Sequence, residues 1–191
     1  MDTYKGSPQD LQSWVSGTNV SKANRSQKAG RVLNTPELVA PLFKLAFGPE
    51  KAVSYKALLI LEQVAIQKPV YILESYHECL DKLHSITEHR SVRPLARITE
   101  IVLLQTFKKK DPLFMDWFRD EDLQKLTTLC FNWLIGQHKP ATKAFAMRSL
   151  YLLGTRISWI HPELKAVIEN KYAEESPAFR ARARHILPKL S

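Results

Sequence analysis

The side chains that most often bind metal ions or carry catalysis follow no recognisable pattern in this chain. The six histidines are His77, His84, His89, His138, His161 and His185. No two of them stand four residues apart with a carboxylate between them, which is the spacing that binds zinc on a helix. His77 and Cys79 are two residues apart and would point to different faces of a helix. We therefore predict no metal site and no cofactor.

Motifs of nucleophilic catalysis and phosphate transfer are also missing. The sequence has no G-x-S-x-G elbow, no G-x-x-x-x-G-K-[ST] loop and no G-x-G-x-x-G turn. Cys130 stands between Leu129 and Phe131 in an apolar pattern with helical spacing, where a thiol is usually inert. We predict no catalytic residue, and we interpret Cys79 and Cys130 as buried free thiols in a reducing, cytoplasmic compartment.

Arginines near the end of the sequence are the side chains best suited to binding an anion. Arg180, Arg182 and Arg184 alternate within Ser176–Leu190, which begins with a capping serine followed by a proline. At about 100° per residue, Arg180 and Arg184 lie about 40° apart around a helix, and Arg182 lies about 160° from either. We interpret Arg184 as the better candidate for contact with an outside anion.

Charge along the chain is distributed in blocks. The formal net charge is +9, of which residues 139–191 contribute +6 and residues 88–110 contribute +4, whereas residues 111–138 contribute −3. Such asymmetry favours an acidic partner, which is either a protein or a nucleic acid. The sequence has no apolar run of the length that a membrane helix needs, and MDTYKGSPQD does not resemble a signal peptide. We expect no membrane partner.

Helices must position these side chains, because glycine is rare and no segment alternates between apolar and polar residues. Four segments read as helix starts, with a capping residue or a proline in the first turn and, in three of them, acidic residues nearby. They are Thr35–Leu38, Lys68–Leu73, Asp120–Leu123 and His161–Leu164. Each leads into apolar residues spaced three and four apart, which is typical of a helix with one buried face.

A second set of segments lies between these starts and shares a common frame. The segments align on four alanines at separations of 39, 50 and 37 residues, namely Ala57, Ala96, Ala146 and Ala183. A small residue suits a point where two helices approach closely, and three of the four segments have a basic residue three positions earlier. The sequence thus predicts a helix-pair repeat of about 40 residues, whose pairs must stack to bury their apolar faces.

This pattern resembles HEAT repeats, in which a second helix opens with a Val-Arg-x-x-Ala element. Val92–Ala96 matches that element best, and Thr142–Ala146 and Phe179–Ala183 are looser versions. The resemblance implies an all-α, α-α superhelix (a HEAT-like solenoid) of about four pairs over residues 35–191, with a capping helix over 22–33. We predict one domain over 21–191 and a tail over 1–20 that holds at most one short helix, around Leu11–Val15.

In HEAT folds the second helices line the concave side, so the resemblance also implies a basic inner surface. Its residues would be Arg93, Arg97, Lys143, Arg148, Arg180 and Arg184. If arginines on this surface pair with carboxylates between repeats, the pattern favours a protein scaffold; a smooth unpaired basic face favours nucleic acid, whose binding weakens steeply with salt.

The C-terminal segments RSLYLLG, WIHPELK and ESPAFRARARHIL resemble a group of short bacterial HEAT-like proteins. Some members of that group carry the label adenylosuccinate lyase, but this chain has no glycine- and methionine-rich serine loop of the kind that lyase uses. A second alternative is the HEAT-like alkylpurine DNA glycosylases, which place an acid beside tryptophans. Asp116 with Trp117, and Glu100, are the candidate acids, whereas we interpret Trp133 and Trp159 as core residues.

The segment Lys108–Asp122 is the least repeat-like part of the chain and explains the long separation of 50 residues. It sets three lysines beside five large apolar residues, so Lys109, Phe114 and Trp117 are candidate contacts of a binding insertion. The alternative, which we favour, is that these apolar side chains pack down onto the repeat, because burying each one stabilises by about 1.5–3 kcal/mol. Together these patterns favour a non-catalytic binding or scaffold protein with an acidic partner.

Overall fold

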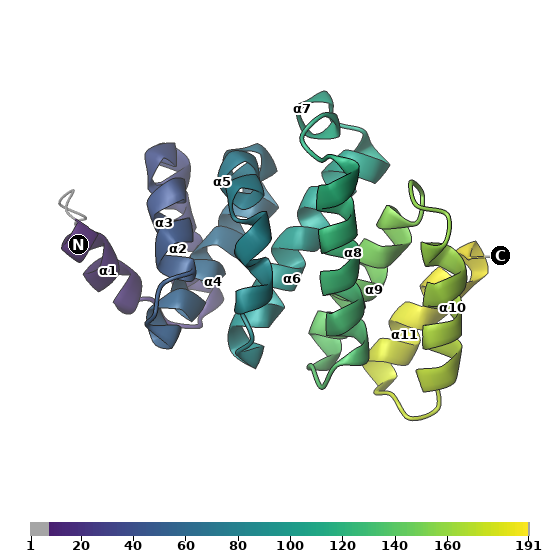
Figure 1. Ribbon diagram of the computed structural model, residues 1–191. Helices are drawn as coiled ribbons and strands as arrows, with labels where there is room; N and C mark the ends of the chain where they lie inside the picture. The colour runs from purple at the N-terminus through teal and green to yellow at the C-terminus, as the bar shows by residue number, and fades with distance from the viewer. Residues whose placement is uncertain (1–7, 191) are drawn as a thin grey trace. The chain divides into compact units, whose positions relative to one another are not determined.

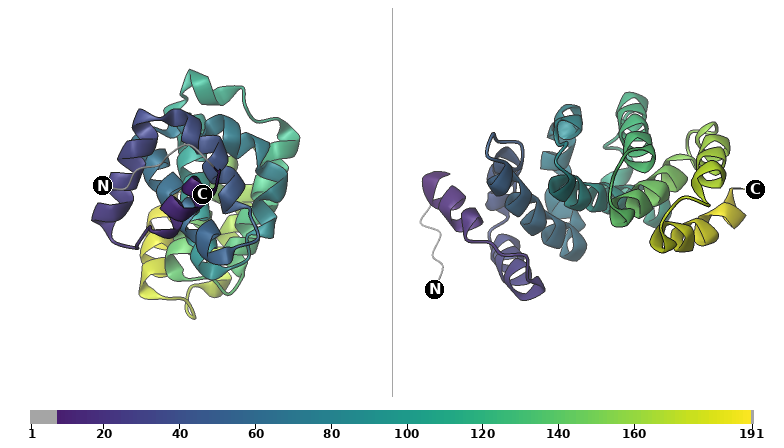
Figure 2. Two further views of the ribbon diagram at one scale, coloured as in Figure 1. Left: turned by 90° about the vertical axis from the view of Figure 1, so that its left-hand side faces the viewer. Right: turned by 90° about the horizontal axis from the view of Figure 1, so that it is seen from below.

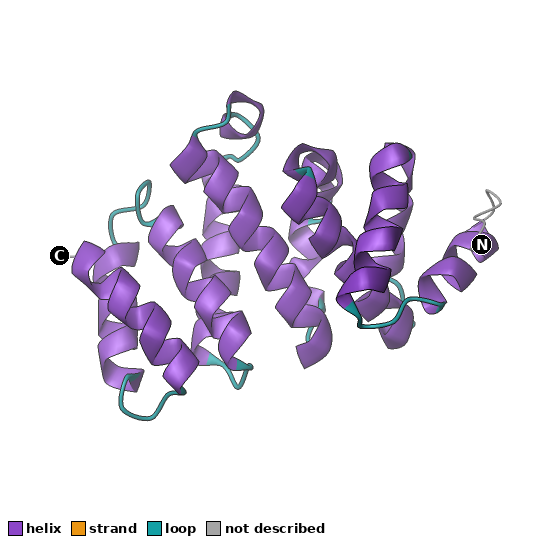
Figure 3. Cartoon of the chain, turned by 180° about the vertical axis from the view of Figure 1, so that it is seen from behind, coloured by secondary structure: helices purple, strands orange, loops and turns teal. Residues whose placement is uncertain are grey.

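The computed structural model describes residues 8–190, and within that range every regular element is a helix (Figure 3). The predicted all-α, HEAT-like class of stacked helix pairs is confirmed. The first seven residues of the tail predicted over 1–20 lie outside the described residues. Among the residues described, no helix has the length and apolar character that crossing a membrane requires.

The chain divides into two compact units, residues 1–98 and residues 99–191. The N-terminal unit contains α1 (Pro8–Ser16), α2 (Lys22–Asn34), α3 (Val39–Ala46), α4 (Lys51–Gln67), α5 (Leu73–Glu78) and most of α6 (His89–Leu103), as Figure 1 shows. The C-terminal unit contains the end of α6, a π-helical turn (Leu104–Lys109), α7 (Pro112–Met115), α8 (Asp120–Ile135), α9 (Pro140–Leu153), α10 (Ile160–Lys171) and α11 (Pro177–Ile186). The predicted division into a tail and a single domain stays a prediction.

Within each unit the helices form two layers (Figure 2, right). In the N-terminal unit, α3 packs against α5 in one layer, and α4 packs on α3 from the other layer. In the C-terminal unit, α8 and α10 lie in one layer and α9 and α11 in the other, with α9 in contact with the other three. In the predicted pairs α3–α4, α8–α9 and α10–α11, the first helix therefore belongs to one layer and the second helix to the other.

The four alanines that defined the repeat frame are all fully buried, one each on α4, α6, α9 and α11. An alanine occupies little space, so a neighbouring helix can approach the backbone closely at that point. The long apolar residues that follow, such as Ile60 and Leu61 on α4, are fully buried as well. The frame read from the sequence thus marks the helix surfaces that face the core.

Helix starts follow the predicted chemistry in part. The Ser176 hydroxyl accepts a hydrogen bond from the Phe179 N–H at 3.2 Å, and Pro177 is the first residue of α11. The start at Thr35 differs, because its side chain makes no capping bond and the chain first forms a 3₁₀ turn over Pro36–Leu38. His161 also differs from a cap, since α10 already begins at Ile160.

Helix α1 is held against the rest of the N-terminal unit by buried side chains. Leu11, Trp14 and Val15 are buried, and α1 packs on α4. The buried Lys28 ammonium donates to the Trp14 carbonyl oxygen and lies 4.6 Å from the centre of the Trp14 ring. A charge can be buried at this point because a carbonyl oxygen and an aromatic face replace its hydration.

The insertion begins where the end of α6 widens into the π-helical turn. Lys110 ends this turn with a left-handed backbone (φ 52°), and the Asp111 carboxylate caps α7 by accepting from the Leu113 N–H at 3.0 Å. Phe114 is fully buried, but Leu113 and Met115 are more than half exposed. The insertion is therefore fixed by one aromatic side chain and leaves other apolar side chains at the surface.

Of the two tryptophans interpreted as core, only one is buried. Trp133 is buried on α8, but Trp159 is 48% exposed and stacks on Phe131, with ring centres 5.9 Å apart. The prediction for Trp159 was wrong because this residue precedes α10 in a turn, outside the apolar stripe of the helix.

Candidate anion-binding site

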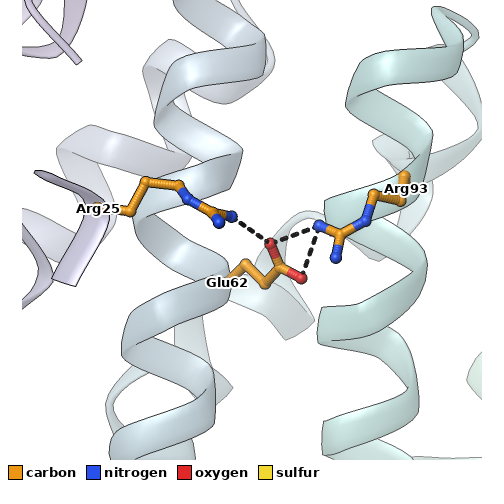
Figure 4. A network of polar contacts seen from close by, with 3 residues as sticks. All are labelled: Arg25, Glu62 and Arg93. Atoms are coloured by element: carbon orange, nitrogen blue, oxygen red, sulfur yellow. Dashed lines mark hydrogen bonds and ion pairs between the residues drawn. The ribbon is translucent and has the colours of Figure 1, made fainter. Parts of the chain in front are cut away.

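One of the predicted basic residues, Arg93, pairs with a buried carboxylate in the N-terminal unit. Arg93 on α6 donates from Nη1 to both oxygens of Glu62 on α4, each at 2.9 Å, and Arg25 on α2 lies 3.7 Å away on the other side (Figure 4). The Glu62 side chain is 3% exposed. Burial raises the pKa of Glu62, and the nearby charges of Arg93, Arg25 and Arg97 oppose that rise. These contacts connect α2, α4 and α6.

Two further predicted residues are paired in the C-terminal unit. The Lys143 ammonium donates to the Glu175 carboxylate, and both side chains are largely buried. Arg148 on α9 donates to Glu100 at 3.3 Å, and the Glu100 side chain is 1% exposed. Glu100, a candidate acid for the glycosylase alternative, thus forms a buried ion pair with an arginine.

Arg180 and Arg184 on α11 differ from Arg93, Lys143 and Arg148. Neither makes an ion pair with a carboxylate within residues 8–190. Arg184 is exposed and Arg180 is half-buried. Of the six residues predicted to form a basic inner surface, Arg93 and Arg97 belong to the N-terminal unit and the other four to the C-terminal unit.

A cavity of about 590 Å³ opens in the C-terminal unit, and we call it the cationic pocket. Its charged and ring-bearing side chains come from the π-helical turn, from α9, and from α11 with the 3₁₀ turn Leu187–Lys189 that follows it. They are Phe107, Lys108, Arg148, Tyr151, Arg182, His185 and Lys189. Within residues 8–190 no carboxylate lines the pocket, so the charged side chains described in its walls are all basic.

Most of these basic side chains were missed by the sequence analysis. The sequence analysis favoured Arg184 over Arg182 as the anion contact, because Arg182 lies on another side of the helix from Arg180 and Arg184. That other side is the one that faces the pocket. Arg182, His185 and Lys189 are spaced three and four residues apart. That spacing places three basic groups on one side of a helix, and it is the signal that would have predicted this site.

The Tyr151 ring, which forms one wall of the pocket, is held in place by His161. The Tyr151 ring stacks on the His161 ring, with centres 5.4 Å apart and planes at 11°, and His161 Nε2 lies 2.9 Å from the Tyr151 carbonyl oxygen. His161 occupies the space where a side chain at Gly154 would lie, because a Cβ there would be 2.0 Å from its ring. The Lys189 ammonium lies 5.9 Å from the centre of the Tyr151 ring.

A second cavity of about 820 Å³ adjoins the insertion, and we call it the insertion hollow. Phe107 and Thr155 line both cavities, so the insertion hollow and the cationic pocket are neighbours within the C-terminal unit. Met115 and Phe118 contribute apolar surface to it. Of the predicted insertion contacts, Phe114 is fully buried, whereas Lys109 is exposed and Trp117 is 37% exposed.

Residues suited to metal or thiol chemistry are not gathered into a site. Within residues 8–190, no cluster of histidine, cysteine and carboxylate side chains has the proximity that a metal ion requires. Cys130 is fully buried, and burial raises the pKa of its thiol to about 12. Because the thiolate is the reactive form, this thiol is poorly suited to act as a nucleophile near neutral pH.

Comparison with known proteins agrees with these helix pairs. A family model described as a HEAT repeat domain matches residues 17–190, so the class defined by the fold is that of HEAT repeat proteins. The chain belongs to this family, which indicates a role in protein interactions. Searches of curated proteins and of solved structures returned no match.

Proposed function

We propose that this protein is a non-catalytic scaffold that binds an acidic segment of a protein partner on the basic side chains of its C-terminal unit. One observation carries the proposal: the cationic pocket gathers four cationic side chains and a histidine, with no carboxylate among the lining residues that the structure describes. Side chains of one sign that surround a hollow focus the electrostatic potential there and attract an oppositely charged partner.

Some of the predicted basic residues are paired with carboxylates inside the protein and others are not, and this difference supports a protein partner. Arg93 and Lys143 are each held by a buried or half-buried carboxylate, which leaves them less available to an outside anion. Pairing of this kind between helices is the pattern that favours a scaffold. We expect Arg148 and Arg182, which line the cationic pocket, to contribute most of the affinity, and Arg180 and Arg184, which do not line it, to contribute little.

Nucleic acid is the second candidate partner, because Phe107 and Tyr151 stand beside the basic groups of the pocket. Aromatic rings next to cationic side chains suit single strands, whose bases stack while their phosphates are neutralised. A base-excision glycosylase would further need a free acid at the site. Glu100 forms an ion pair with Arg148 instead, which makes simple binding the better form of this alternative.

Fluorescence anisotropy with two labelled probes tests the proposal. The first probe is a short peptide rich in aspartate and glutamate, and the second is a single-stranded DNA of similar net charge. We expect the peptide to bind and to weaken as salt rises. Tighter binding of DNA, with log K falling by about 0.7 per neutralised phosphate for each unit of log salt, would favour the nucleic-acid alternative instead.

The insertion is proposed as a second contact for the partner, through Lys109 and Trp117. Its exposed apolar side chains lie next to the cavity that shares Phe107 with the cationic pocket. Replacing Trp117 by alanine should weaken binding of a partner captured from the native cell while leaving the short acidic peptide unaffected. A captured partner that is released by nuclease would contradict a protein partner.

A further inference from the structure

We infer that the cationic pocket is a phosphate site that takes a phosphorylated side chain of the partner. This inference rests on the proposed function and names the group that the pocket recognises. Three features carry it: the charge left over after internal pairing, the convergence of basic groups from separate elements, and the rigid ring that forms one wall.

Charge balance separates a phosphate from a carboxylate. Glu100 offsets the charge of Arg148, but within residues 8–190 no carboxylate lies within ion-pair distance of Arg182, Lys108 or Lys189. In the described part of the chain, the pocket therefore holds three cationic groups that no carboxylate neutralises. A phosphate monoester brings about −1.5 to −2 charges near neutral pH and three strong acceptor oxygens. A single carboxylate brings about half that charge and would leave the pocket with a larger excess.

Placement of the donors suits a tetrahedral anion. The two arginines are half-buried and come from different helices, α9 and α11, while both lysines are exposed. Guanidinium groups bind phosphate oxygens in pairs, and ammonium groups add charge without a fixed direction. Arg148 is also oriented before any ligand arrives, because Glu100 holds one of its nitrogen atoms. The arginines would then hydrogen-bond the phosphate oxygens, while the lysines attract the phosphate by their charge.

The apolar and aromatic lining suits the body that carries the phosphate. Leu152 and Ile186 contribute apolar surface, and Tyr151 is fixed by its stacking on His161. A volume of about 590 Å³ lies within the range of pockets that hold a whole small ligand. The same phosphate chemistry could be presented by a protein side chain or by a free nucleotide, and the experiment separates these sources.

Isothermal titration with matched ligands tests the inference. The ligands are an acidic peptide with one phosphoserine, the same peptide with serine, the same peptide with glutamate, and a free nucleoside monophosphate. We expect the phosphoserine peptide to bind about tenfold or more tightly than the serine peptide, with the glutamate peptide between them. A nucleoside monophosphate that binds as well as the phosphoserine peptide would support the phosphate site and identify a small molecule as its source.

The chain offers a matched pair of variants on one helix. Arg182→Ala removes a donor of the cationic pocket, whereas Arg184→Ala removes an exposed arginine that does not line it. We expect R182A to weaken the phosphoserine peptide about tenfold or more and R184A to change it by less than about twofold. Lys189→Ser is a second pocket variant at an exposed position, for use if R182A shows a lowered midpoint of thermal unfolding.

The possible results distinguish failure of the phosphate site from failure of the acidic-partner proposal. Equal binding of the serine and phosphoserine peptides would overturn the phosphate site and leave the acidic-partner proposal standing. No binding of any acidic peptide would overturn both. Loss of phosphoserine binding in R184A but not in R182A or K189S would place the anion outside the pocket and overturn the inference.

Discussion

Gly154 is the position where one added methyl group should damage the C-terminal unit most clearly. An ideal Cβ at residue 154 would lie 2.0 Å from His161 Cδ2 and 2.3 Å from Nε2, far inside van der Waals contact. Because Gly154 has an ordinary helical backbone (φ −63°), backbone strain does not explain the glycine. The side chain of His161 explains it, since the ring occupies the space that a larger residue would need.

The expected cost of Gly154→Ala follows from what the displaced ring loses. Forcing an extra carbon into packed structure costs about 1–3 kcal/mol. If the His161 ring swings away, the bond to the Tyr151 carbonyl and the stacking on the Tyr151 ring are lost, at about 1 kcal/mol each. Replacing glycine by alanine also lowers the conformational entropy of the unfolded chain, which stabilises the folded protein by about 0.4–1 kcal/mol. Together these contributions give an expected net loss of about 2–4.6 kcal/mol in the free energy of unfolding.

Gly30→Ala is the matched control. Gly30 lies inside α2, and a Cβ there would meet no atom within 4 Å. The same substitution should stabilise the protein at this site by about 0.5–1 kcal/mol, because alanine favours the helix. The two glycine-to-alanine changes should therefore have opposite signs.

Urea unfolding followed by far-ultraviolet circular dichroism measures all of these variants. The double variant G154A with His161→Ala should be more stable than the sum of the two single changes allows, with a coupling of about 1 kcal/mol or more. A neutral or stabilising G154A would refute the reasoning. Additive effects of the two changes would refute it as well, because they would mean that the methyl group and the ring do not meet.

Three other predictions concern a thiol, a buried acid and the insertion. Burial raises the pKa of Cys130 to about 12, so at pH 8 its alkylation by iodoacetamide should require unfolding and should speed up with added urea; rapid alkylation without urea would contradict this burial. Burial also raises the pKa of Glu62 above its ordinary value of 4.5, so the folded protein binds more protons at this site than the unfolded chain does. The advantage of wild type over Glu62→Gln in free energy of unfolding should thus be largest below pH 4.5 and decline as pH rises through the raised pKa, and a rising advantage over that range in urea titrations would contradict this direction. Finally, Phe114→Ala should cost about 3–5 kcal/mol and speed tryptic cleavage after Lys110, whereas Trp117→Ala should cost less than about 1 kcal/mol, and equal effects would show that Phe114 does not anchor the insertion.

The sequence predicts the helix pairs well because their signals are local. Buried alanines such as Ala146, prolines in first turns and the Ser176 cap each act within one or two turns of their own position. The long separation between Ala96 and Ala146 also locates the insertion. These features can be recognised without knowing which segments of the chain meet in space.

The anion site could not be predicted to the same depth, because its composition depends on contacts between distant residues. Arg148 and Glu100 are 48 residues apart, and nothing in either segment indicates that one neutralises the other. The direction of Arg182 depends on how α11 packs on α9, which decides the face that becomes the pocket wall. The spacing of Arg182 with His185 and Lys189 can be read from the sequence, but the alternation of Arg180, Arg182 and Arg184 is the more conspicuous pattern.

The central claim is that the cationic pocket of the C-terminal unit is where the partner binds. Nuclear magnetic resonance titration of the labelled protein with the phosphoserine peptide tests this claim most directly. We predict that the largest amide shifts will cluster at Tyr151, Thr155 and Arg182, with small changes at Trp159 and at Arg25. Shifts centred on α10 or on the N-terminal unit, with those three amides unmoved, would contradict it.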